Sequence, residues 1–250
     1  MPRFYISPLR WNLDRLVLDE EETHHATDVL RMKEGDRAVV FNGEGVEAAV
    51  EIASISKRAV ELRRLHTSQT APPACRITLG QAIPKGKNMD LIVQKATELG
   101  AAAVVPLLTA HTIVQCDDAR EAEKKREKWQ GVAVEACKQC GQDWLPLVHS
   151  PQTLHDFFKQ TATTFDLLLI ASLQADSVHP KEVFADYLQE IGTKPASVLV
   201  LIGPEGDFTP AEIALAKAHG SRPITLGPIV LRTETAALYC LSVLSYELLG

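Results

Sequence analysis

Two loops late in the chain combine glycines with charged side chains. An apolar run over residues 198–202 ends in the sequence GPEG at 203–206, and Thr209 then precedes Pro210 at an expected helix start. Glycines at the carboxyl end of a buried strand let backbone N–H groups approach a ligand closely. The loop at 203–206 therefore indicates either a ligand site or a plain strand-to-helix turn.

The second loop, residues 226–236, reads LGPIVLRTETA and also joins an expected strand to an expected helix. The first turn of a helix has unpaired N–H groups and a partial positive charge. Arg232 adds a cation at this point, so the loop favours an anion or a developing negative charge. The alternative is a simple helix cap with a surface ion pair between Arg232 and Glu234.

A third segment, residues 80–90, follows an expected strand and opens a helix. Lys85 and Lys87 flank Gly86 there, which suits contact with phosphate groups or simple exposure to solvent. Other chemical motifs have little support. The CxxC pair at 137 and 140 lies inside an expected helix without further ligands, so no metal site is expected. The chain has no GxGxxG after a first strand, no phosphate loop and no GxSxG elbow.

The elements that position these loops fall into two parts around residues 67–74, TSQTAPPA, which resemble a linker. Short strands and one helix before it suggest a small barrel. Asp19 with Glu22 predicts a capping box at the start of that helix, and residues 42–45, NGEG, predict a hairpin turn. The expected strands are 4–6, 15–18, 38–41, 46–55 and 59–65.

After the linker, strands and helices alternate, which predicts a parallel sheet with helices on both faces. The last helix, 233–249, is apolar almost all round, so it is buried either against a partner subunit or within one chain. The expected strands are 77–83, 103–108, 166–170, 198–202 and 224–226. The other expected helices are 88–99, 119–140, 180–191 and 210–219.

Composition places the chain among globular proteins. It has 250 residues, 46% of them hydrophobic, and a net charge of −6. No run is long enough for a membrane span, and we expect no membrane partner. Five cysteines without framework spacing indicate reduced thiols in the cytoplasm. Basic residues cluster in the first quarter, and local basic patches can bind phosphates even on an acidic protein.

Taken together, the motifs resemble those of the bacterial 16S ribosomal RNA uracil-N3 methyltransferases of the SPOUT superfamily, over essentially the whole chain. The motifs that carry the resemblance are Arg3-Phe4, His24-His25, 29–31 (VLR), Gly35-Asp36, 81–86 (QAIPKG), 94–100 (QKATELG), 202–206 (IGPEG) and 231–236 (LRTETA).

The resemblance implies an α/β fold in two domains. Residues 1–70 would form a PUA-like β-barrel that helps to hold RNA, and residues 71–250 a SPOUT methyltransferase domain with a C-terminal trefoil knot. It further implies a homodimer that acts on 16S rRNA in the 30S subunit with S-adenosylmethionine as cofactor. The residues expected to bind the cofactor are Ile202, Gly203, Gly206, Leu226, Gly227 and Leu231.

The implied reaction aligns a sulfonium methyl group with N3 of an accessible uracil and removes the N3 proton. We expect Arg232 to stabilise the resulting anion, and Glu205 or Glu234 to accept the proton or to orient Arg232. Phosphate contacts should dominate RNA affinity. The residues expected to make them are Arg3, Arg10, Arg31, Lys85 and Lys87.

Three positions depart from the family pattern. Asp207 stands where a second glycine is usual, and Ile229 and Gln142 stand where arginine is common. Asp207 can change the conformation of its loop, and the two lost arginines can weaken RNA contact. Two other functions are considered: an RNA-binding protein without catalysis that keeps the SPOUT fold, and a SPOUT enzyme that methylates a ribose 2′-hydroxyl.

Overall fold

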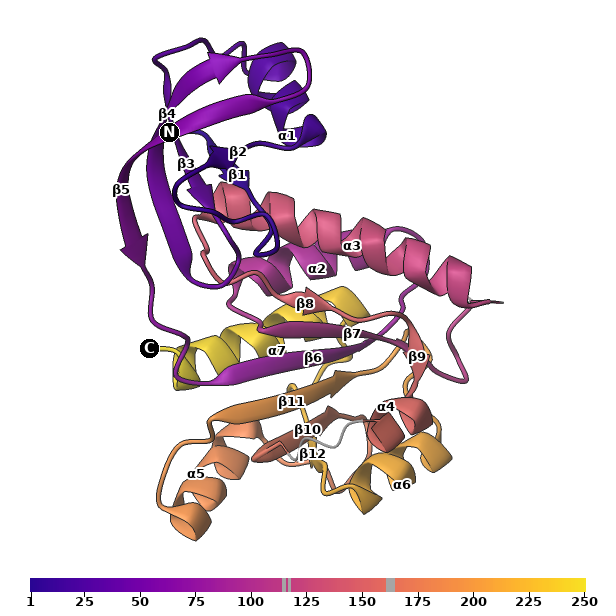
Figure 1. Ribbon diagram of the computed structural model, residues 1–250. Helices are drawn as coiled ribbons and strands as arrows, with labels where there is room; N and C mark the ends of the chain where they lie inside the picture. The colour runs from indigo at the N-terminus through magenta and orange to yellow at the C-terminus, as the bar shows by residue number, and fades with distance from the viewer. Residues whose placement is uncertain (114–115, 117, 161–164) are drawn as a thin grey trace. The chain divides into compact units, whose positions relative to one another are not determined.

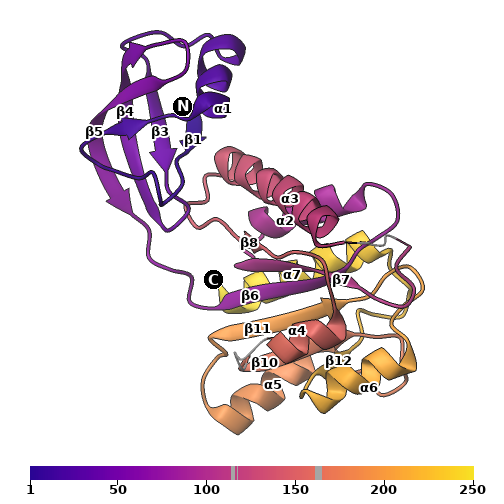
Figure 2. The ribbon, with the colours of Figure 1, turned by 45° about the vertical axis from the view of Figure 1, so that its right-hand side comes forward.

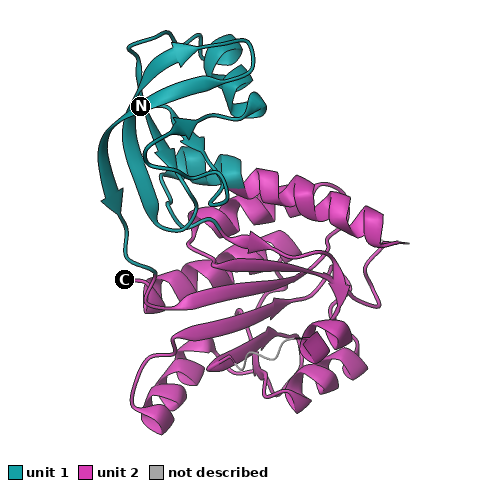
Figure 3. Cartoon of the chain, in the orientation of Figure 1, with its two compact units in different colours: residues 1–72, 134–145 teal, residues 73–133, 146–250 magenta. Residues whose placement is uncertain are grey.

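The computed structural model describes residues 1–113, 116, 118–160 and 165–250, and the chain divides into two compact units (Figure 3). Unit 1 contains residues 1–72 and 134–145. Unit 2 contains residues 73–133 and 146–250. Within the described ranges, no helix has the length and apolar character needed to cross a membrane.

The strands of unit 1 are β1 (Arg3–Tyr5), β2 (Leu16–Val17), β3 (Arg37–Phe41), β4 (Val46–Ile55) and β5 (Val60–Gln69). They form a curled sheet in the order β1-β3-β4-β5-β2, in which only β1 and β3 are parallel (Figure 1). Along β4, alternate residues such as Val50 and Ile52 are buried in a core with Phe4 and Leu16. This is the two-residue period of a strand with one covered face.

The helical segment of unit 1 consists of α1 (Glu20–His24) and a π-helical turn, His25–Val29. Asp19 caps it as expected, because its carboxylate accepts the N–H of Glu22 at 2.9 Å. The return bond of the predicted capping box, from the Asp19 N–H to the Glu22 carboxylate, is wrong. The buried Glu22 carboxylate accepts the N–H of Tyr5 and pairs with Lys138 at 3.0 Å, since a buried carboxylate needs a cation.

The strands of unit 2 are β6 (Arg76–Ala82), β7 (Ala103–Leu108), β8 (Leu147–Val148), β9 (Gln152–Thr153), β10 (Leu167–Ala171), β11 (Ser197–Ile202) and β12 (Arg222–Ile224). They form one sheet in the order β12-β10-β11-β6-β7-β8, and β9 also pairs with β7 (Figures 1 and 2). Every recorded pairing is parallel, which confirms the predicted parallel sheet.

The helices that begin in unit 2 are α2 (Asn88–Glu98), α3 (Ala119–Cys140), α4 (Leu154–Gln160), α5 (Pro180–Ile191), α6 (Pro210–Ala218) and α7 (Thr233–Leu248). On one face of the sheet, Phe157 of α4 and Ile213 of α6 pack with Leu199 and Leu201. On the other face, α5 and α7 lie around Val200. Successive residues of β11 therefore face opposite helical layers, which explains its continuous apolar sequence.

Several bounds differ from the predictions. β5 continues to Gln69, into the expected linker, because β4 pairs with it as far as Val46. β12 begins at Arg222 rather than at residue 224, since Arg222 to Ile224 pair with β10. The short elements β8, β9 and α4 were not predicted. Two-residue strands and a helix of two turns carry too few residues to show a period.

Candidate functional site

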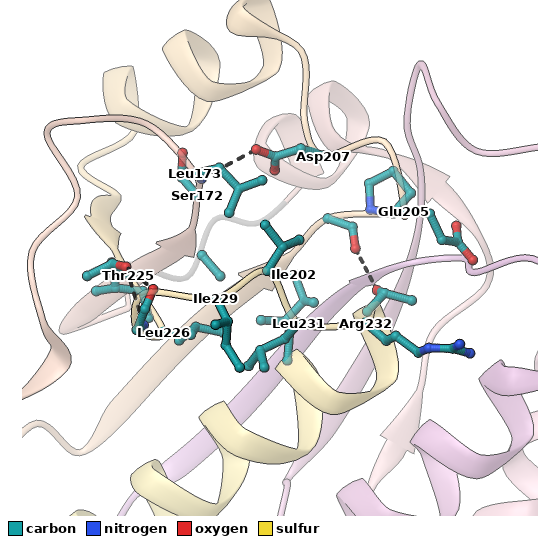
Figure 4. A pocket seen from close by; sticks show the side chains of 18 residues that line it. Ser172, Leu173, Ile202, Glu205, Asp207, Thr225, Leu226, Ile229, Leu231 and Arg232 are labelled. Atoms are coloured by element: carbon teal, nitrogen blue, oxygen red, sulfur yellow. Dashed lines mark hydrogen bonds between the residues drawn. The ribbon is translucent and has the colours of Figure 1, made fainter.

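A cavity of about 300 Å³ opens at the carboxyl ends of β10, β11 and β12 (Figure 4). Its wall comes from three segments: 171–173, 202–207 and 224–236. Carboxyl ends of parallel strands are the usual place for ligands in such sheets, and the volume is at the lower end of the range for small-molecule sites. Of the 18 lining residues, most are apolar, and only Glu205, Asp207 and Arg232 carry charge.

The glycine loop after β11 folds tightly back on itself. A Cβ atom on Gly203 would lie 3.2 Å from a carboxylate oxygen of Asp207 and 3.3 Å from the backbone nitrogen of Phe208. The N–H of Asp207 donates to the carbonyl oxygen of Pro204 at 3.0 Å, which closes the turn. After it, Thr209 caps α6 in a complete capping box with Glu212, as its position before Pro210 predicts. A side chain at position 203 would therefore force its neighbours in the turn to shift.

The second glycine loop supplies the apolar side of the cavity. Gly227 has a φ of +117°, a backbone angle that residues other than glycine rarely adopt. Leu226 and Leu231 are half-buried, whereas Ile229 and Val230 are 69% and 76% exposed. All five residues line the cavity. Ile229 therefore adds an exposed apolar side chain to the cavity lining.

A buried hydrogen-bond chain joins this site to the centre of the sheet. Thr233, the first residue of α7, donates from Oγ1 to the carbonyl oxygen of Gly203 at 2.6 Å. Gln81, at the end of β6, donates from Nε2 to the same hydroxyl at 3.1 Å and to the carbonyl oxygen of Ala82. The start of α7 is thereby fixed to the glycine loop, although 152 residues separate Gln81 from Thr233 in sequence.

Arg232 is the residue that precedes α7. Its backbone is extended, its side chain is exposed, and it makes no ion pair with any residue in the described part of the chain. The guanidinium group extends away from the apolar wall, toward the side on which Glu205 lies (Figure 4). Glu234 lies in the first turn of α7, and it neither lines the cavity nor pairs with Arg232. A free arginine at this helix start can meet an anion.

Glu205 connects the cavity to the lysine loop. It lines the cavity, but its carboxylate points outward, where Oε1 accepts the N–H of Lys85 at 2.9 Å. The side chains of Lys85 and Lys87 are exposed, and Lys87 is the residue before α2. The structure therefore places the 85–87 loop beside the 203–206 loop, on the same edge of the sheet.

Gly206 has a different environment from the other expected cofactor residues. It does not line the cavity; a Cβ atom there would lie 3.1 Å from the ring of His111. His111 donates from Nδ1 to the carbonyl oxygen of Asp207 at 2.9 Å, with the tautomer that a carbonyl acceptor requires. The loop after β7 therefore supports the glycine loop through residues 206 and 207.

The three arginines expected in unit 1 differ in availability. Arg3 is 14% exposed and binds Glu47 and Asp143, each at 2.6 Å. Burial alone would lower the pKa of Arg3, but the hydrogen bonds to these carboxylates raise it above its ordinary value. Arg10 is half exposed, 3.5 Å from Asp19. Arg31 is exposed, and its φ of 55° is unusual for a residue with a side chain.

Sequence reasoning did not identify the loop after β10 as part of the site. Ser172 and Leu173 line the cavity, as does Thr225 after β12. The apolar run at 167–170 could have indicated Ser172 and Leu173, because the carboxyl end of every parallel strand is a candidate site. The position of β10 between β11 and β12 makes the difference, and strand order is not visible in one sequence.

Two protein-family models together match most of the chain. Residues 71–245 match the model of an RNA methyltransferase domain, and residues 18–63 match that of an RNA methyltransferase PUA domain. The chain is 32% identical to ribosomal RNA small subunit methyltransferase E of Bacillus subtilis, over 99% of this chain and 97% of the relative. With the Synechocystis enzyme of the same name the identity is 31%, over 96% of this chain and 76% of the relative.

Two solved structures have the same fold. A putative methyltransferase of Legionella pneumophila, with the bound cofactor SAM, is 34% identical with a TM-score of 0.85, covering 98% of this chain and 97% of that one. Ribosomal RNA small subunit methyltransferase E of Neisseria gonorrhoeae, bound to S-adenosyl methionine, is 28% identical with a TM-score of 0.83, covering 99% and 98%. The chain therefore belongs to the ribosomal RNA small subunit methyltransferase E family of RNA methyltransferases.

Proposed function

We propose that this protein transfers a methyl group from S-adenosylmethionine to N3 of one uracil of 16S rRNA in the 30S subunit, in the cytoplasm. The observation that carries the proposal is the cavity at the carboxyl ends of β10, β11 and β12, which has an apolar wall and a free arginine at its rim. The curated relatives are named as ribosomal RNA small subunit methyltransferases, and two solved relatives contain S-adenosylmethionine.

The residues of the cavity fit the cofactor. Leu226 and Leu231 would offer apolar surface to an adenine ring, and the buried Ile202 belongs to the same lining. The glycine turns at 203 and 227 bring backbone groups to the surface of the cavity. Gly206 contributes indirectly, because its lack of a side chain lets His111 support the loop. When bound, the cofactor supplies a sulfonium methyl group that is already electrophilic. The C-terminal trefoil knot remains a prediction.

Removal of the N3 proton leaves a negative charge on the uracil, and Arg232 is our candidate to stabilise it. Its guanidinium is free of carboxylates in the described chain, and it stands at the amino end of α7, where the helix dipole adds to its charge. Of the two candidate proton acceptors only Glu205 lines the cavity, and its carboxylate would have to turn from the N–H of Lys85 to take up the proton. A base must lie within hydrogen-bond reach of its proton.

RNA binding is assigned to exposed cations in both units. Lys85 and Lys87 belong to the loop beside residues 203–206, and Arg10 and Arg31 are exposed on unit 1. Charge reversal at these sites should weaken binding to 30S subunits and reduce its salt dependence. Arg3 is neutralised by two carboxylates, so we expect its substitution by alanine to reduce stability and leave the salt dependence unchanged.

The homodimer is proposed from α7. The helix packs on the sheet through Cys240 and Leu244, yet Tyr239 and Tyr246 are 40% and 85% exposed on its outer side. Exposed aromatic side chains in such an arrangement are typical of subunit interfaces. Sedimentation equilibrium of the purified protein tests this, and a monomer at micromolar concentration would contradict it.

The decisive experiment is a methyl-transfer assay with labelled S-adenosylmethionine and 30S subunits from a strain that lacks this activity, followed by nucleoside mass spectrometry. We expect 3-methyluridine at one site of 16S rRNA. A 2′-O-methylated nucleoside would indicate ribose methylation instead. Cofactor binding without transfer would indicate a different RNA or assembly state as substrate. Absence of both transfer and cofactor binding would favour an RNA-binding protein without catalysis.

The role of Arg232 is tested by single-turnover kinetics of Arg232→Ala and Arg232→Lys. The matched control is Arg76→Ala, because Arg76 is also exposed but begins β6 at the opposite edge of the sheet. Loss of an oxyanion contact costs about 100-fold or more in rate. An unchanged rate in Arg232→Ala would contradict the assignment.

A further inference from the structure

Asp207 has an unusual backbone at the edge of the cavity. Its φ of 58° is in the left-handed region, and among the described residues only Arg31 shares this feature without being glycine. Asparagine and aspartate tolerate this region better than other side chains, but glycine adopts it without strain. A strained residue that lines a ligand cavity calls for a functional explanation.

The Asp207 carboxylate is held in a fixed position. Its Oδ1 accepts the N–H of Phe208 at 2.8 Å, and its Oδ2 accepts the N–H of Leu173 at 3.4 Å, across the cavity edge (Figure 4). His111 fixes the backbone of the same residue by donating to its carbonyl oxygen. Asp207 therefore joins the loops after β7, β10 and β11, and its charged group cannot turn freely away from the cavity.

No cation in the described part of the chain pairs with this carboxylate. Two other charged residues line the cavity. Arg232 extends away from the apolar wall, and Glu205 points outward to the N–H of Lys85 (Figure 4). Asp207 is thus the charged side chain that is held against the cavity between the loops after β10 and β11.

We propose that Asp207 makes the cavity selective for the positively charged methyl donor over its neutral product. The inference rests on the proposed function. S-adenosylmethionine carries one positive charge more than S-adenosylhomocysteine, because the sulfonium becomes a thioether when the methyl group leaves. A fixed negative charge binds the donor more tightly than the product and so favours exchange of product for donor after each turnover.

The expected size of the effect follows from the dimensions of the cavity. Asp207 lines a cavity of about 300 Å³, and we take roughly 10 Å, the order of the span of such a cavity, as the separation between its carboxylate and the bound sulfonium. At about 10 Å and an effective dielectric constant of about 20 to 40, one pair of unit charges changes affinity by about 4- to 20-fold. Because Asp207 is only half-buried, solvent screening favours the lower end of this range.

The test is calorimetric titration of the intact protein with three ligands: S-adenosylmethionine, S-adenosylhomocysteine, and sinefungin, an analogue with an amine in place of the sulfonium. Asp207→Asn removes the charge and keeps an acceptor for the N–H of Phe208. We expect the ratio of product Kd to donor Kd to fall by about 4- to 20-fold in this variant. Sinefungin should lose affinity as the donor does.

Two further variants separate charge from structure. Asp186→Asn removes an exposed charge on α5, away from the cavity lining, and should leave all three affinities unchanged. His111→Ala removes the backbone support without changing a cavity charge, and should weaken donor and product equally. Asp207→Gly should reproduce the change of ratio seen in Asp207→Asn.

The outcomes distinguish the inference from the function on which it rests. Equal weakening of donor and product in Asp207→Asn, or no change in either, would overturn the selectivity proposal while cofactor binding by the unaltered protein still stands. If the unaltered protein bound neither donor nor product, the cofactor assignment itself would be wrong.

Discussion

Replacement of Thr233 by valine should damage both the fold of unit 2 and its cofactor site. Valine has nearly the same shape as threonine, so the change removes one hydroxyl group from a residue that is 5% exposed. That hydroxyl donates to the carbonyl oxygen of Gly203 at 2.6 Å and accepts from Gln81 at 3.1 Å. Gln81 is fully buried and its Oε1 already lacks a partner in the described structure.

The cost can be estimated from the groups left behind. The variant loses two hydrogen bonds and leaves one amide hydrogen of Gln81 and the Gly203 carbonyl without their partner, at about 1–2 kcal/mol each and about 2–4 kcal/mol in total. For a chain of 250 residues this corresponds to a Tm lower by about 4–16 °C. Because Thr233 and Gly203 both line the cavity, we also expect about tenfold weaker S-adenosylmethionine binding, equivalent to about 1.4 kcal/mol.

Differential scanning calorimetry with and without cofactor measures both quantities. Thr233→Ser is the matched control, since serine keeps the hydroxyl and loses one methyl group, at about 0.8 kcal/mol. The reasoning would be refuted if the valine variant unfolded at the temperature of the unaltered protein, or if serine and valine were equally destabilising.

Three other results are expected. Burial raises the pKa of Cys137 and of Cys240 to about 12, whereas unfolded thiols ionise near about 8.5. Their contribution to the free energy of unfolding is therefore complete below about pH 8.5 and is lost as the pH rises toward 12. Urea titrations from pH 7 to 10.5 should show a falling free energy of unfolding, and the fall should be smaller when both cysteines are replaced by alanine. Arg31→Gly relieves a left-handed backbone and should raise the free energy of unfolding by about 0.5–1 kcal/mol. It should also weaken RNA binding and reduce the salt dependence of that binding. Unchanged stability would contradict the strain, and unchanged RNA binding would contradict the phosphate contact. Gly80→Ala places a Cβ atom 2.5 Å from a methyl group of the buried Leu201 and should cost about 1–3 kcal/mol by urea denaturation, an effect that Leu201→Val in the same chain should partly reverse.

The sequence predicted those parts of the fold that local pattern controls. β4, β7, α3 and α5 have the expected bounds, because apolar periodicity and flanking turn residues define them. The parallel sheet followed from the alternation of strands and helices. Glu22 shows the limit of local reading, since its partner Lys138 lies 116 residues away and replaced the predicted local bond.

The candidate site was predicted in its loops but not in its connections. The sequence indicated the segments 203–206 and 226–236, and both contribute to the cavity. It did not indicate that Thr233 holds Gly203, or that Ser172 and Leu173 complete the wall. The contribution of Ser172 and Leu173 depends on β10 lying between β11 and β12, and the Thr233–Gly203 bond depends on the packing of α7 against β11. A single sequence contains neither kind of information.

The return of residues 134–145 to unit 1 has a consequence for biogenesis. Arg3 at one end of the chain must meet Asp143, a sequence separation of 140 residues. When synthesis has just passed residue 72, the nascent chain contains the sequences of all five strands of unit 1, but it still lacks Lys138 and Asp143. The N-terminal unit therefore completes its native contacts only after more than half of the protein has left the ribosome, and loop closure of this length is slow. A truncated chain of residues 1–72 lacks the cation that pairs with Glu22.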